Sequence, residues 1–380
     1  MKKIFTLAVA ALAAMSANAQ DYNTFVNNDA RQEFPTKMEA IQAPKTLPNG
    51  LRKAKAVVKD ETATYEGTYV HSVWVYDENY DYIESSCDVV FTKQDDGTYA
   101  IQNFVGRGTG DYKATLDAET GQLVAQPGQL LFTHQSYGDV SIYACYINDD
   151  YEIEVDLERE IRFSIDGDRI MIDNDGIVMV ITSGQYTGYI LNTYMLFNQF
   201  DRVNATMTCT NNKGENLSYN VAWDGDAAND GEVDIYGFRN YTCVTIVTDA
   251  ETGLAYMPNG QDALYYDSQY GMFSTVGLVN ENGTYYLADS TAGTFDVENN
   301  VIKLGLWGFG NTTGTLIGGV IDNTEITGPA LIPVVGIDAV AVENKCEAVA
   351  APAYDLMGRQ TEATRRGQLY IREGRKFIVR

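Results

Sequence analysis

The chain has 380 residues, with 52 Asp and Glu against 27 Lys and Arg, so its formal net charge at pH 7 is −25. So acidic a chain is repelled by phosphate backbones and by anionic lipid, which argues against nucleic acids and membrane surfaces as partners. Cationic ligands, neutral glycans and divalent ions remain open, and the length is sufficient for two ordinary domains.

Residues 1–19 have the pattern of a secretory signal peptide. Two lysines precede an apolar run from Ile4 to Met15, and the small-residue sequence A-N-A predicts cleavage after Ala19. A buried N-terminal helix is the alternative. No later stretch reaches the ~18 uninterrupted apolar residues that a spanning helix needs, so we expect an exported chain with no membrane span.

Residues 20–63 follow as a leader with few aromatic residues, three prolines and the basic stretch LRKAKAVVK. This composition predicts a flexible segment in front of the first domain. An inhibitory or peptide-binding pro-segment is the alternative. We expect folded structure to begin near residue 64.

From Tyr65 to about Thr327 the chain alternates short strand patterns with turn signals. Runs such as YVHSVWVY, CDVVFTK and VSIYACYI are separated by clusters of Asp, Asn and Gly. Period-2 alternation with a turn signal at intervals of about ten residues is typical of β-hairpins in a meander. The sequence therefore predicts an all-β fold.

Parts of this region recur in the same order further along the chain. ATLDAETGQL at 114–123 returns as TIVTDAETGL at 245–254, and RFSIDGDRIMI at 162–172 returns as TFDVENNVIKL at 294–304. Both matches lie about 132 residues apart, which is the signature of an internal duplication. Chance similarity between two strand-rich halves is the alternative.

The duplication predicts two tandem repeated antiparallel β-barrel or β-sandwich domains, 64–191 and 192–327, plus a short C-terminal β tail. Closing each sheet would remove its exposed strand edges. The sequence EGTY at 66–69 opens the first repeat and resembles the Gly-x-aromatic start of the calycin-like (lipocalin-like) barrels, although the second repeat lacks this glycine. The resemblance implies a barrel whose open mouth takes a small apolar ligand.

Residues 328–351 form a linker to the C-terminal segment 352–380. That segment contains YDLMGR at 354–359, GQLYIREG at 367–374 and the ending KFIVR. In this order the motifs resemble the end of the type IX secretion sorting domain, which implies a small β-domain recognised by outer-membrane secretion machinery and usually removed. The sequence upstream departs from the family pattern, and a terminal hairpin packed against the body is the alternative. We expect a secreted or cell-surface protein, or a periplasmic one if the tail is not a working sorting signal.

The five cysteines are too few and too scattered for a disulfide-built fold, and no CxxC pair suggests zinc. Bridges Cys87–Cys145 and Cys209–Cys243 would each lie within one repeat. Buried thiols are equally open, and Cys346 would remain odd.

Few residues carry catalytic or metal chemistry. There are two histidines and no HExxH, GxSxG or phosphate-binding glycine loop, so we name no catalytic residue, no metal ligand and no cofactor. The stretch DGDAANDGEVDIYGF at 224–238 resembles a calcium loop, but Ala228 and Gly237 stand where oxygen ligands belong. It also matches the first repeat at 96–104, which favours an ordinary turn between strands.

Aromatic residues give the positive indication of function. The 26 Tyr and three Trp exceed what β cores of this size need, and aromatic faces flanked by acids or amides bind sugar rings or protein surfaces. Our ligand-binding candidates are Trp74, Tyr76, Trp223 and Trp307. The sequence favours a non-enzymatic binding protein for a glycan or an extracellular protein. A secreted carboxylate-dependent hydrolase and a lipocalin-like carrier of a small apolar ligand are the alternatives.

Overall fold

The computed structural model forms two compact units, Met1–Pro329 and Ala330–Arg380. Its described residues are nearly all in strands, with one 3-10 turn, η2 (Phe104–Gly106), and no helix among them is long and apolar enough to cross a membrane. The predicted signal peptide 1–19 and most of the linker 328–351 lie outside the described residues. Those residues are 35–44, 51, 64–76, 81–107, 112–238, 242–261, 265–267, 271–311, 317–330, 353–354, 360–361, 369–372 and 375–378.

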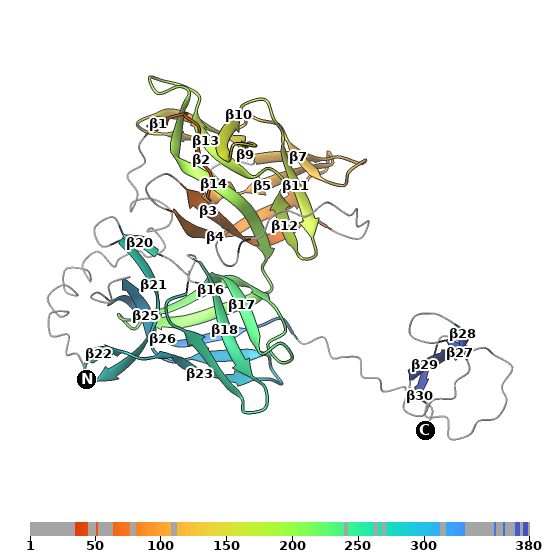
Figure 1. The fold of residues 1–380 in the computed structure, drawn as a ribbon, viewed down its shortest axis with the longest axis vertical. Coiled ribbons are helices and arrows are strands. Elements are labelled where there is room, and N and C mark those ends of the chain that lie inside the picture. Colours follow the sequence, from red (N-terminus) through yellow and green to blue (C-terminus); the bar gives the residue numbers. More distant parts are fainter. Residues whose placement is uncertain are drawn as a thin grey trace. The chain divides into compact units, whose positions relative to one another are not determined.

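Eight antiparallel strands close the first barrel (Figure 1). They pair in chain order, and the last strand, β14, pairs with both β12 and β3, so the ring has no free edge. The strands are β3 (Gly67–Tyr76), β4 (Asp81–Lys93), β5 (Thr98–Gln102), β6 (Tyr112–Leu116), β7 (Leu123–Ala125), β11 (Ile161–Asp166), β12 (Arg169–Ile172) and β14 (Tyr189–Arg202).

The second barrel has the same eight-stranded ring, closed between β26 and β15. Its strands are β15 (Ala205–Asn211), β16 (Asn216–Asp224), β17 (Glu232–Phe238), β18 (Thr242–Asp249), β19 (Leu254–Pro258), β23 (Ser290–Asp296), β24 (Val301–Leu304) and β26 (Ile317–Thr327). Two closed barrels in tandem confirm the predicted all-β fold class. Because each ring is closed, its short strands have no exposed edge.

Each barrel continues from its last strand into a side sheet. In the first domain β13 joins β14 to β9, and β9 also pairs with β8 and β10; in the second, β25, β21, β20 and β22 take the same places. Apart from β1 and β2, every strand of the first domain's sheet therefore has a counterpart in the second. The strands are β8 (Leu130–His134), β9 (Gly138–Ile147), β10 (Glu152–Asp156), β13 (Gly176–Ile181), β20 (Tyr265–Asp267), β21 (Gly271–Glu281), β22 (Thr284–Leu287) and β25 (Trp307–Asn311), with β1 (Pro35–Lys37) and β2 (Ile41–Gln42) at the edges of the first domain's sheet.

Strand β14 crosses the predicted domain boundary between residues 191 and 192. Its residues Arg202 and Asp201 pair with β3, and Asp201 also pairs with β12, so they belong to the first barrel. The first domain ends at Arg202 and β15 of the second begins at Ala205. The sequence similarity between the repeats fades before this strand, which is why it did not locate the junction.

Two glutamines occupy equivalent places in the two domains, 132 residues apart. Gln129 donates from Nε2 to the Lys113 carbonyl at 2.8 Å and accepts from the Lys113 backbone N–H at 3.0 Å. Gln261 makes the same pair of bonds to Thr245, at 2.8 and 2.7 Å. Each glutamine side-chain amide satisfies a backbone N–H and a backbone carbonyl that no neighbouring strand reaches. The two domains therefore share this side-chain interaction as well as their strand order.

The closing strand of each barrel contains a bulge at the same place. Phe197 in β14 and Asn323 in β26 have φ angles of 52° and 50°, and the pairing register shifts beside each. Positive φ in a residue other than glycine costs free energy, so a fixed partner must hold the bulge. In β14 that partner is His71, whose Nε2 lies 2.9 Å from Oδ1 of the buried Asn198.

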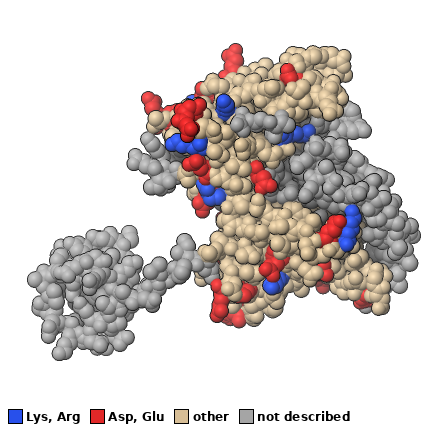
Figure 2. Space-filling model, turned by 180° about the vertical axis from the view of Figure 1, so that it is seen from behind, with Lys and Arg blue, Asp and Glu red and all other residues tan. Residues whose placement is uncertain are grey.

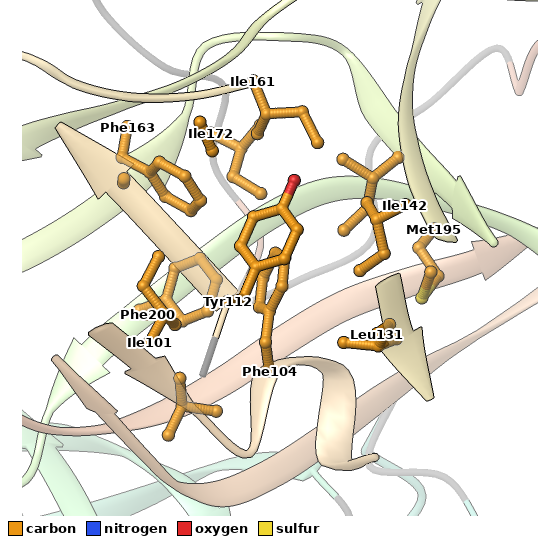
Figure 3. Packing of buried hydrophobic residues seen from close by; sticks show 14 of the residues in the cluster. Ile101, Phe104, Tyr112, Leu131, Ile142, Ile161, Phe163, Ile172, Met195 and Phe200 are labelled. Atoms are coloured by element: carbon orange, nitrogen blue, oxygen red, sulfur yellow. The ribbon is translucent and has the colours of Figure 1, made fainter. Parts of the chain in front are cut away.

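Large aromatic side chains fill the first barrel (Figure 3). Phe104, Tyr112, Phe163 and Phe200 converge from η2, β6, β11 and β14, and none is more than 1% exposed. His71 from β3 stacks on Phe200 with ring centroids 4.3 Å apart. Burial lowers the pKa of His71 to about 4, so the folded barrel contains a neutral imidazole.

The predicted flexible leader 20–63 is ordered over 35–44. Here β1 pairs with β14 and β2 pairs with β10, and the Glu39 carbonyl accepts a hydrogen bond of 2.7 Å from the Tyr194 hydroxyl. Composition indicated flexibility because the segment is polar and proline-rich. The backbone groups of the leader nevertheless find hydrogen-bond partners on strands of the first domain's sheet.

The second unit contains a four-stranded antiparallel sheet in the order β28-β27-β29-β30. It falls within residues 352–380, where the sequence predicts a short β tail. The strands are β27 (Ala353–Tyr354), β28 (Gln360–Thr361), β29 (Leu369–Arg372) and β30 (Arg375–Ile378).

Three cysteine side chains in the described residues are thiols. Cys145 and Cys209 are buried and Cys243 is partly buried. Neither a Cys87–Cys145 nor a Cys209–Cys243 bridge is formed, and burial raises the pKa of the Cys145 thiol, which makes it a poor nucleophile.

The buried imidazole predicts a specific acid sensitivity. Unfolded His71 takes up a proton near pH 6.5, whereas folded His71 does so only near its pKa of about 4. Between these values the unfolded state binds more protons, so the free energy of unfolding falls by about 1.4 kcal/mol for each pH unit of acidification. In urea unfolding, the His71→Gln variant should lack this pH-dependent loss of the free energy of unfolding, whereas the His134→Gln variant should retain it. Equal slopes for wild type and His71→Gln would contradict the assignment.

Candidate functional site

Trp307 lies in the core of the second barrel. Its fully buried ring packs on Phe238 and Phe309, with ring centroids 4.8 and 5.6 Å away. Its Nε1 donates at 2.8 Å to Oγ1 of Thr324, the residue after the bulge at Asn323. Trp307 therefore holds the closing strand of its barrel, and its ring is not open to a ligand.

Trp74 and Tyr76 lie together on β3, on the face that the ordered leader covers. Trp74 is 3% exposed and belongs to one cluster with Phe197, Tyr76 and the leader residues Ala43 and Leu51. Its ring centroid lies 5.7 Å from that of Tyr76 and 6.1 Å from that of Phe197. Tyr76 is half-buried, so this cluster is a small core between the leader and the domain.

Trp223 lies near the end of β16, where the chain enters the acidic turn. The Asn204 side chain accepts from its backbone N–H at 2.8 Å and donates to its carbonyl at 3.0 Å. The indole Nε1 donates to the Gly225 carbonyl at 3.3 Å, and the residue is 5% exposed. All three tryptophans are thus buried, and they do not form the exposed stacking platform that the sequence predicted. Trp223 borders a cleft.

The cleft lies between the two barrels and has a volume of about 270 Å³. Its walls come from the β11–β12 hairpin, the end of β14, the connector to β15 and the end of β16. Carboxylates dominate the lining, because it includes Asp166, Asp168, Asp201 and Asp224. Segments from both domains are required to build it.

The β11–β12 hairpin places two carboxylates at the rim of the cleft. Asp166 and Arg169 pair across a two-residue turn, and Gly167 at its first position has a φ of 67°. This is the positive φ that a tight hairpin turn of the II′ kind demands. Asp166 and Asp168 are consequently exposed, whereas Arg169 turns inward and is buried.

Arg169 joins the two barrels beneath the cleft. Its Nε donates to Asp201 of its own barrel, and its Nη2 donates at 2.9 Å to Asp224 of the second barrel. The guanidinium carbon lies 5.4 Å from the centre of the Tyr236 ring, also in the second barrel. Burial raises the pKa of Asp201, opposed by the charge of Arg169 and by a 2.9 Å hydrogen bond from Gln199. The Arg169 guanidinium therefore stabilises the contact between the two barrels through its ion pairs with Asp201 and Asp224.

Arg202, the other cation of the cleft, secures the start of the first barrel. It donates to the carbonyls of Thr64 and Glu66, both at 2.9 Å, and stacks over Tyr69 with its guanidinium carbon 4.8 Å from the ring centre. A Cβ on Gly67 would lie 2.5 Å from Arg202 Nη1, and Gly67 has a φ of 150°. The positive φ of Gly67 favours glycine, and Tyr69 of EGTY provides the ring on which Arg202 stacks.

The cleft as a whole offers hydrogen-bond acceptors to a ligand. Asp166 and Asp168 stand at the exposed rim, and both arginines already bind carboxylates or carbonyls of the protein. Sequence reasoning selected Trp223 but missed the aspartates and Asn204. The motif IDGDR was visible, but nothing local shows that this turn meets the end of β16, because the two segments lie more than fifty residues apart.

The acidic turn after Trp223 is held by its own side chains. Asp226 accepts from the backbone N–H groups of Ala228 and Asn229, both at 3.2 Å, and its backbone N–H donates to Asp230 at 3.3 Å. These bonds define a capped turn that precedes β17. In the described part of the chain, no group of three His, Cys, Asp or Glu side chains is arranged to hold a metal ion.

Comparison with known proteins gives no match: no family model, no curated protein and no solved structure is significantly similar to this chain.

The contacts between the two barrels predict that Arg169→Ala lowers the free energy of unfolding more than Arg162→Ala does. Arg169→Ala leaves the buried Asp201 without its cation and should lower the free energy of unfolding by about 3 kcal/mol. Arg162 is the matched control, since it binds Asp117 at 3.4 Å and Glu160 at 2.8 Å on an exposed face. Arg162→Ala should cost less than about 1 kcal/mol. Denaturant unfolding measures both, and an Arg169→Ala protein as stable as wild type would refute the role of this cation.

Proposed function

We propose that the chain is an exported, non-enzymatic binding protein and that the cleft between its barrels holds one ring of a neutral glycan. The observation that carries the proposal is the meeting of Trp223 with the rim carboxylates Asp166 and Asp168 in a small cleft. Aspartate oxygens accept hydrogen bonds from sugar hydroxyls, and an indole edge offers apolar contact to the C–H faces of the ring.

The dimensions and charge of the cleft favour a small uncharged ligand. A volume of about 270 Å³ lies just below the usual range of ligand sites, about 300–1,000 Å³, and suits a single ring rather than a long chain. Rim carboxylates repel anions, and the two arginines are engaged with the protein itself. A neutral polyol fits this arrangement better than an acidic ligand does.

The two alternative functions have less support. A lipocalin-like carrier needs room inside a barrel, and packed aromatic side chains fill the first one (Figure 3). A hydrolase needs an acid and a base facing each other across a substrate. Asp201 and Asp224 share Arg169, and the other two aspartates of the lining, Asp166 and Asp168, come from the same hairpin, so they do not form such a pair.

Glycan-array screening of the purified chain tests the proposal, followed by calorimetric titration of any glycan that binds. Replacing Asp166 and Asp168 together by Asn should raise Kd by about tenfold or more, because two charged acceptors become neutral. The matched control is the Asp149→Asn, Asp150→Asn variant in the exposed β9–β10 turn, which should bind like wild type. Turnover of the glycan would favour the hydrolase, and unchanged binding by the rim variant would reject the cleft as the site.

We also propose that the tail, residues 352–380, directs the export of the chain to the cell surface or the medium. The resemblance of 352–380 to the sorting domain supports it, as does the separation of Ala330–Arg380 into a unit of its own. Deleting 352–380 should therefore retain the chain in the periplasm, whereas the full chain reaches the surface or the medium. Fractionation and immunoblotting measure this, and equal surface amounts of both chains would contradict a sorting role.

A further inference from the structure

The outer side of the second barrel exposes an apolar sheet surface, which we name the β19 face. It consists of the outward side chains of Val247 on β18, Leu254 and Tyr256 on β19, and Ala292 on β23. Val247, Tyr256 and Ala292 lie side by side across the three strands. Leu254 is 56% exposed and Tyr256 is 44% exposed. Large apolar side chains grouped in this way mark an interaction surface.

The first barrel provides an internal control for this face. At the places 132 residues earlier it carries Gln122 for Leu254 and Glu160 for Ala292. Arg162, at the place of Thr294, binds Glu160 at 2.8 Å and Gln122 at 3.2 Å.

The two faces have the same strands in the same order, so the fold itself does not require an apolar surface here. The second barrel lacks this polar network: Leu254 and Ala292 stand in the places of Gln122 and Glu160, and the exposed Tyr256 stands in the place of Val124. Exposure of these groups to water brings no folding advantage. The difference therefore points to a partner that covers the face.

We propose that this partner is a second copy of the chain, packed face to face through the two β19 faces. With a net charge of −25, two copies repel each other wherever carboxylates meet. Figure 2 shows that acidic side chains are spread over the described surface on one side of the molecule. The four side chains of the β19 face carry no charge, so two copies can approach there at low electrostatic cost.

The row of side chains through Leu254 is self-complementary. Asp249, Leu254, Thr294 and Lys303 are successive neighbours across β18, β19, β23 and β24, so the row has an acid at one end and a base at the other. A two-fold axis parallel to the strands, between β19 and β23, lays Asp249 of one copy over Lys303 of the other, at both ends. Lys303 binds Glu325 at 2.9 Å yet keeps 61% of its side chain exposed, so it can accept a second carboxylate. Aligned sheets pack face to face in this manner.

Sedimentation equilibrium of the full chain over micromolar concentrations tests the proposal. Wild type should have the mass of two chains. The Leu254→Gln, Tyr256→Val variant carries the residues that the first barrel has at these places, so its fold should persist. Its dimer Kd should rise by about tenfold or more, the effect of removing an anchor residue from an interface.

Two further variants complete the test. Ala292→Glu restores the charge that the first barrel carries and should weaken the dimer by itself. Leu130→Gln alters a 59% exposed leucine of the first domain and should leave the dimer unchanged. A wild-type chain that stays monomeric throughout overturns the proposal, as does a β19-face variant that retains its fold and dimerises as tightly as wild type.

Discussion

The architecture depends on one local constraint, the bulge in the closing strand of each barrel. β3 pairs with β14 on both sides of the bulge, whereas on the other edge the first part of β14 pairs with β13 of the side sheet and its last part pairs with β12 of the ring. The strand can serve both sheets only because Phe197 takes a positive φ and changes the pairing register. A buried His71–Asn198 hydrogen bond holds this bulge, and Trp307 with Thr324 does the same in β26. Without the bulge, the end of β14 would not bring Asp201 and Arg202 to the junction.

The sequence predicts the fold well because the information is local. Alternating apolar residues define strands, and repeated turn motifs such as DAETG recur at a constant spacing, so all-β structure and duplication follow from short stretches. The places of the tryptophans are less predictable. The period of a strand shows which residues share a face, but not that a leader covers Trp74 or that Trp307 anchors a bulge. Those contacts join different strands or segments, and the alternation within one strand does not reveal them.

The same limit applies to the candidate site. Trp223 was selected because it is aromatic, yet its importance comes from the cleft beside it. That cleft is built by the turn of one domain and a strand end of the other, and Arg169 crosses between them. No spacing within either repeat encodes this meeting, since it arises only when the two barrels pack. The acidic stretch after Trp223, by contrast, was predicted to be a turn from the repeat alone, and its side chains cap that turn.

Duplication gives two domains with one backbone plan and different surfaces. Both copies contain the glutamine hydrogen bonds of Gln129 and Gln261, whereas the outer faces of the two barrels differ. We propose that the junction between the barrels forms a glycan site. A crystal structure of the chain with a bound oligosaccharide would test this proposal. We predict one sugar ring beside Trp223, with its hydroxyls within hydrogen-bond distance of Asp166 and Asp168. A ligand bound elsewhere on the barrels, with the cleft filled only by solvent, would show that the cleft is not the glycan site.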